Sequence, residues 1–170
     1  MARKSKKSKD VFTLTVPLSY NSQEKKLLDR LFSAGLMIEH HLISRKLKAL
    51  HQLERTKAWK QVQADIAKKY KDGSDAKDPE LRRLFERRAN LLQEARLTAS
   101  CFEKDAKRHA RVYKGIVHSQ TVQKLAANVW ASFDEYLYGN GKTIHFKSWK
   151  DFLSMYGKSN ETAFDTKMDV

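Results

Sequence analysis

Apolar residues recur at helical spacing over most of this chain, and the pattern predicts a helical region at residues 21–138. The longest stretch runs from Leu27 to Leu53, and its apolar positions cover about 200° of a helical wheel. Such a wide apolar face suits a helix that is packed on more than one side, so we expect the central helix of a bundle. Asn21 followed by Glu24 is the pattern of a capping box, which places the start of this helix.

Four further helices are expected, for about five in all. Asp78 followed by Pro79 predicts the start of the third helix, with Asp78 as the N-cap and proline at the first helical position. Ser100 with Glu103 predicts a second capping box. The expected ranges are about 57–71, from 78 onward, 100 to about 114 with Gly115 as C-cap, and about 119 to 138, stopped by Gly139.

The pattern changes to a period of two near both ends of the helical region. Phe12, Leu14 and Val16 alternate with threonines, and Ile144 and Phe146 alternate with polar residues. We therefore expect a first strand in residues 11–20 and the remaining short strands in residues 139–170, with the helical region inserted between them. Two or three short strands are marginal alone, so we expect the chain to be the front part of a longer protein.

The charge of the chain indicates what kind of partner it binds. The 170 residues include 34 Lys and Arg against 20 Asp and Glu, which gives a net charge of +14 and an isoelectric point near 9.9. This excess favours polyanions as partners, nucleic acid above all. Residues 1–10 are expected to be a basic disordered tail that contacts phosphates on nucleic acid, through Arg3, Lys4, Lys6, Lys7 and Lys9.

Other cations are candidates for phosphate contact. Arg83 and Arg87 share the outward face of the third helix, one turn apart, where simple solvation is the alternative explanation. Four lysines lie in the region of the expected C-terminal strands: Lys142, Lys147, Lys150 and Lys158.

Two charged residues fall inside apolar faces. Glu39 lies near the middle of the first apolar face, and Arg88 lies within that of the third helix. An unpaired buried charge is costly, so we expect Glu39 either in a structural ion pair or beside a solvent gap at the Gly35 turn. Arg88 is expected either to snorkel along its stem or to pair with a buried acid. One candidate pairing joins Glu39 to Arg88.

Several kinds of chemistry find no support in the residues. The single cysteine, Cys101, excludes paired cysteine ligands for zinc, and the six histidines show no ligand spacing. The acids lie scattered on expected helix faces, so we predict no catalytic residue, metal or cofactor. No apolar run approaches the length of a membrane span, and a single cysteine suits a reducing cytosol, so a cytoplasmic protein is expected. Its expected nucleic-acid partner would associate it with the nucleoid.

The stretch "VHSQTVQKLAANVWASFDEYLYGNGKTIHFKSW", followed by "GKSNETAF", resembles the N-terminal region of TnpB-like proteins, the OrfB transposases of insertion sequences related to type V CRISPR effectors. The match is strongest over residues 116–164 and weaker but collinear from 11 to about 50. The resemblance implies that the strands belong to an incomplete wedge-like β-barrel and the helices to a recognition lobe, and that both bind guide RNA and target DNA. Members of the family carry a RuvC-like nuclease and a zinc ribbon further along, and neither is present in these residues, so the chain is expected to be a truncated member without activity.

Two hypotheses for function follow. The first is a nucleic-acid-binding N-terminal fragment of a TnpB-like transposase or RNA-guided nuclease, with RNA and DNA as partners. The second is a self-contained basic helical module for protein–protein interaction or DNA-binding regulation.

Overall fold

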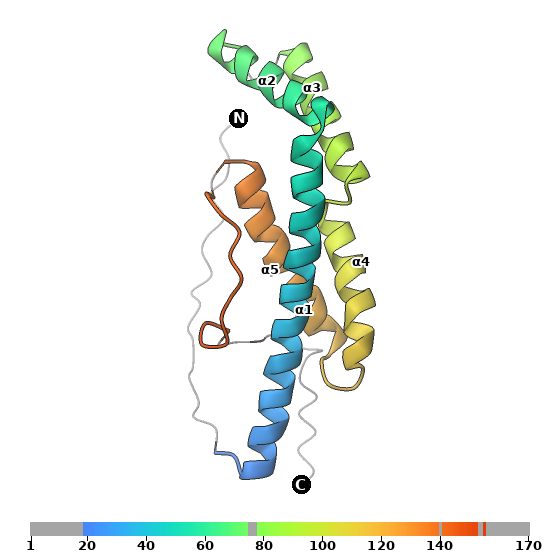
Figure 1. Ribbon diagram of the computed structural model, residues 1–170, viewed down its shortest axis with the longest axis vertical. Coiled ribbons are helices and arrows are strands. Elements are labelled where there is room, and N and C mark those ends of the chain that lie inside the picture. Colours follow the sequence, from blue (N-terminus) through green and yellow to red (C-terminus); the bar gives the residue numbers. More distant parts are fainter. Residues whose placement is uncertain (1–18, 75–77, 140, 153–154, 156–170) are drawn as a thin grey trace, which may run out of the picture.

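A long central helix organises this mainly helical protein (Figure 1). The computed structural model describes residues 19–74, 78–139, 141–152 and 155. In chain order, its helices are α1 (Ser22–Arg55), α2 (Lys57–Lys71), α3 (Pro79–Glu94), α4 (Ala99–Ala110), the short 3-10 helix η1 (Arg111–Tyr113) and α5 (Ser119–Leu137). None of the described helices is both long and apolar enough to cross a membrane.

Local capping signals set both ends of α1. The Asn21 side chain accepts hydrogen bonds from the backbone N–H groups of Gln23 and Glu24, at 2.9 Å each, and the Glu24 carboxylate accepts from the Asn21 N–H at 2.7 Å. The predicted capping box is therefore confirmed. At the other end Thr56 closes α1 and also begins α2, where its hydroxyl accepts from the Trp59 N–H at 3.2 Å. The 34 residues of α1 span about 50 Å, the length along which the other helices pack.

Helices α2 and α3 form a pair at the C-terminal end of α1 (Figure 1). Asp78 caps α3 by accepting from the Glu80 N–H at 2.8 Å, and Pro79 is the first helical residue, as predicted. The pair has a small core of its own, made by Val62, Ile66 and Leu81.

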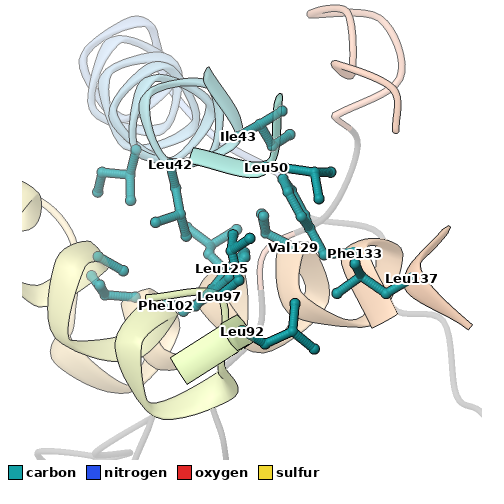
Figure 2. Packing of buried hydrophobic residues seen from close by; sticks show 14 of the residues in the cluster. Leu42, Ile43, Leu50, Leu92, Leu97, Phe102, Leu125, Val129, Phe133 and Leu137 are labelled. Carbon is teal, nitrogen blue, oxygen red and sulfur yellow. The ribbon is translucent and has the colours of Figure 1, made fainter. Parts of the chain in front are cut away.

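The main core lies where α4 and α5 pack on each other and on the middle of α1 (Figures 1 and 2). Figure 2 shows Leu42 and Leu50 of α1 directed toward Phe102 of α4 and Phe133 of α5. The rings of Phe102 and Phe133 meet edge to face with centroids 5.0 Å apart. Because one side of α4 packs into this core, the opposite side of α4 faces the solvent.

The start and the end of α4 differ from the predicted helix boundaries. The Ser100–Glu103 capping box is wrong, because α4 begins at Ala99 after Thr98, and no side chain caps it. The predicted end near Lys114 corresponds to η1, which follows α4, and Gly115 then takes a positive φ of 82°. Helix α5 begins at Ser119 and ends two residues before Gly139, as predicted.

The predicted strand at residues 143–148 does not form, and no strand occurs in the described ranges. This segment instead runs back along the molecule without regular secondary structure (Figure 1). It contacts α1 through side chains: the rings of Phe146 and His40 meet edge to face at 5.3 Å, and Ile144 packs against the main core. The alternation that predicted a strand therefore reflects one-sided packing on a helix. Of the first predicted strand, in residues 11–20, only residues 19 and 20 are described, and they form no strand. The residues beyond 155 lie outside the described part of the chain.

Candidate nucleic-acid interface

The predicted site residues Arg83 and Arg87 lie on α3 at the edge of a groove of about 580 Å³ between α2 and α3. Both are exposed. The groove is also lined by the acids Asp65, Asp72 and Glu80, and its Lys69 forms ion pairs with Asp78 and Glu80. The positive charge of this groove is therefore largely balanced, which weakens its attraction for phosphate.

Lys147 takes part in the fold. Its Nζ lies 3.3 Å from Oε1 of Glu39, whose side chain is only 3% exposed, and its carbonyl oxygen lies 2.7 Å from Nε2 of His40. Glu39 thus has its counter-ion in the segment after α5, and the suggested pairing of Glu39 with Arg88 is wrong. Lys142 and Lys150 are exposed. The remaining predicted contacts, Lys158 and the five cations of residues 1–10, lie outside the described residues.

Changing Lys147 to Glu should therefore act on stability first. The change leaves the buried carboxylate of Glu39 without its cation and adds a second negative charge beside it. Because Lys147 is 44% exposed, solvent screens part of the effect, and we expect a loss of about 1–3 kcal/mol in the free energy of unfolding. Urea unfolding followed by circular dichroism measures it.

Lys150→Glu is the matched control, because Lys150 is exposed and forms no ion pair within the described part of the chain. It should stay within about 0.5 kcal/mol of the parent protein. Equal stability of the two variants would show that the Glu39–Lys147 pair is unimportant.

A second cationic surface is more strongly unbalanced. Its five residues are all exposed and lie on the outer side of α4 and along η1: Lys104, Lys107, Arg108, Arg111 and Lys114. We call this surface the α4–η1 face. Within the described ranges no carboxylate forms an ion pair with any of the five. Lys107, Arg111 and Lys114 border a hollow of about 290 Å³ next to the start of α5.

The spacing of this face was visible in the sequence, although it was not among the predicted contacts. Positions 104, 107, 108 and 111 follow the i, i+3, i+4, i+7 pattern and fall within about 100° of a helical wheel. The spacing alone does not show which side of α4 faces the solvent. The structure shows it, because Phe102 and Ala106 on the opposite side are fully buried.

A buried ion pair also holds α4 in this orientation. Asp105 is 8% exposed, and its carboxylate lies 2.8 Å from Nζ of Lys46 on α1, which is 2% exposed. It also lies 2.9 Å from Nη2 of Arg96. Lys46 further donates to the Arg96 carbonyl oxygen at 2.8 Å and lies 4.6 Å from the centre of the Phe102 ring. Burial opposes the charge of Asp105, but the hydrogen bond and charge of Lys46, with the charge of Arg96, still lower the pKa of this carboxyl.

Arg96 itself occupies the left-handed region, with φ of 59°, at the turn between α3 and α4. A non-glycine residue there carries a cost of about 1–2 kcal/mol. The turn places both the carbonyl oxygen and the side chain of Arg96 against the Lys46–Asp105 pair. The strained backbone is thus tied to the contact that orients α4.

Two histidines stack where α4 meets α1. The rings of His41 and His109 lie 3.6 Å apart and within 4° of parallel, and Tyr113 packs edge to face on His109. Burial lowers the pKa of His109, and the neighbouring His41 and Arg45 lower it further. The folded protein therefore favours the neutral form of His109.

We expect the protein to lose stability as the pH falls below about 6.5, the ordinary pKa of histidine. The pKa of His109 is lower in the folded state, so the unfolded chain binds the proton first and stability falls through the folded-state pKa. Melting temperatures between pH 7.5 and 5 measure this, and His109→Gln should flatten the slope in that interval. An unchanged slope in the variant would assign the effect to other groups.

Comparison with known proteins found no match to any family model, to any curated protein or to any solved structure.

Proposed function

We propose that this protein binds nucleic acid through the phosphate backbone. Among the described residues, the α4–η1 face makes most of the phosphate contacts. The observation that carries the proposal is the set of five exposed cations without described carboxylate partners. A net charge of +14 adds long-range attraction for a polyanion.

The geometry of the face suits a phosphate chain. Lys104, Lys107 and Arg111 are spaced by one helical turn or nearly so, and the first and last lie about 10 Å apart along the helix axis. Lys107, Arg111 and Lys114 also line one hollow, so the three cations border the same concave surface. None of these contacts carries sequence information, so binding through this face is independent of base sequence.

We further propose that the chain is related to the N-terminal region of TnpB-like proteins, with RNA and DNA as its partners. The proposal rests on the residue resemblance over 116–164 together with a mainly helical region preceding it. In that relation the helices correspond to a recognition lobe. The predicted tail contacts, Arg3 to Lys9, and Lys158 would add phosphate contacts to those of the α4–η1 face.

Binding measured against salt concentration tests the function. The logarithm of the affinity for a duplex oligonucleotide should fall linearly with the logarithm of salt, with a slope of roughly −4 to −5 if five phosphates are contacted. Fluorescence anisotropy of a labelled duplex supplies the measurement. Absence of binding at low salt, or an affinity that salt leaves unchanged, would favour the second hypothesis, an interaction module for a protein partner.

A further inference from the structure

Arg88 on α3 is a buried cation without an acid. Only 8% of the residue is exposed, and no described carboxylate lies within ion-pair distance of it. Its Nη2 donates to the Leu137 carbonyl oxygen, while Nε is fully buried without a hydrogen bond. Burying a guanidinium without a carboxylate costs several kcal/mol even after relaxation. Its placement therefore needs an explanation.

Two aromatic rings offset part of that cost. The guanidinium carbon lies 4.7 Å from the ring centre of Tyr138 and 5.7 Å from that of Trp59. A cation over a ring face is stabilised by the ring quadrupole. Trp59 is buried, whereas Tyr138 is 56% exposed, so Arg88 supports the ring of Tyr138 from inside and leaves much of that ring open to solvent.

A hollow adjoins this open ring. It has a volume of about 390 Å³ and is lined by Phe85, Glu86, Arg88, Ala89 and Tyr138. A volume of this size lies within the range of small-molecule sites. Its lining offers two aromatic rings, the exposed Tyr138 and the partly buried Phe85, together with the buried cation of Arg88 and the exposed carboxylate of Glu86.

We propose that this hollow holds an unpaired nucleobase of a single-stranded nucleic acid, stacked on Tyr138. Exposed aromatic rings and arginine planes are the surfaces on which proteins stack splayed bases. The polar edge of a base has donors, which match the exposed carboxylate of Glu86. This inference rests on the proposed function, and it adds to phosphate contact a subsite that requires a base.

The test uses the whole chain and two fluorescent single strands of eight nucleotides, one carrying bases throughout and one with abasic sites at every position. The two strands have equal phosphate charge, so any difference in affinity reports base contacts. The parent protein should bind the base-bearing strand about 5- to 150-fold more tightly. Tyr138→Ala should abolish this preference and leave the salt dependence unchanged, and Tyr138→Phe should retain it.

Tyr20→Ala is the matched control, because Tyr20 is 54% exposed and lies before α1. It should behave as the parent protein does. Equal binding of both strands by the parent protein, with a steep salt dependence, would overturn the base subsite and leave the proposed function standing. Binding of neither strand would overturn the base subsite, and absence of duplex binding as well would overturn the proposed function. An undiminished preference in Tyr138→Ala would remove Tyr138 from the site.

Discussion

Replacing Asp105 with asparagine is expected to lower the free energy of unfolding by about 3–5 kcal/mol. The side chain keeps its shape, so no cavity forms, but the Lys46 ammonium loses the carboxylate 2.8 Å away while it remains 2% exposed. Typical domains are stable by only about 5–15 kcal/mol, so this single charge carries a large share. Urea unfolding followed by circular dichroism gives the number.

A double variant separates the loss of the pair from the cost of an unpaired buried charge. Replacing both partners, as Lys46→Met with Asp105→Leu, should recover most of the loss, because no buried charge remains. Glu103→Gln serves as the control on the same helix, since Glu103 forms no ion pair in the described ranges, and should change stability by about 0.5 kcal/mol or less. If Asp105→Asn unfolds at the same urea concentration as the parent protein, the ion pair does not hold α4 in place.

Helix ends were predictable because their signals are local. Asn21 and Asp78 bond to backbone groups two or three residues away, and Gly139 takes its positive φ of 81° within its own turn. Interactions of this range are contained in a short window of sequence. The failed capping box at Ser100 shows the limit, since the same residue types begin α4 without forming the bond.

Charge pairing was not predictable because it depends on packing. Lys46 lies four residues after Leu42 and four before Leu50, so the sequence already placed it on the apolar face. Its partner Asp105 comes from another helix, 59 positions later, and Glu39 finds Lys147 at a separation of 108. Periodicity assigns a residue to a face, but only the assembled bundle decides which faces meet.

The dependence of charge pairing on packing also explains why the cationic surface that the sequence singled out on α3 is more nearly balanced in charge than the α4–η1 face. The sequence singled out Arg83 and Arg87 by their outward spacing, yet the folding of α2 against α3 brings Asp65 and Asp72 beside them, in addition to Glu80 of α3 itself. On α4, Asp105 is turned inward and Glu103 forms no ion pair in the described ranges, so the outward cations outnumber the acids beside them. The net charge of a surface therefore depends on which acids the packing removes from it.

Neutralising the α4–η1 face should weaken nucleic-acid binding more than any other change of equal charge in the described residues. In the triple variant Lys107→Gln, Arg108→Gln, Arg111→Gln, three phosphate contacts are lost. Because each contact contributes about 0.9 to the slope of log affinity against log salt, the slope should become shallower by roughly 2.7. Salt titrations of a labelled duplex, measured by anisotropy, determine the slope for each protein.

The double variant Arg83→Gln, Arg87→Gln is the control, and it removes two cations that acids already neighbour. Its slope should change by clearly less than the roughly 1.8 expected if both residues contacted phosphates. All five side chains are exposed, so neither variant should unfold, which melting curves check. A larger effect in the double variant than in the triple one would move the interface to the groove between α2 and α3.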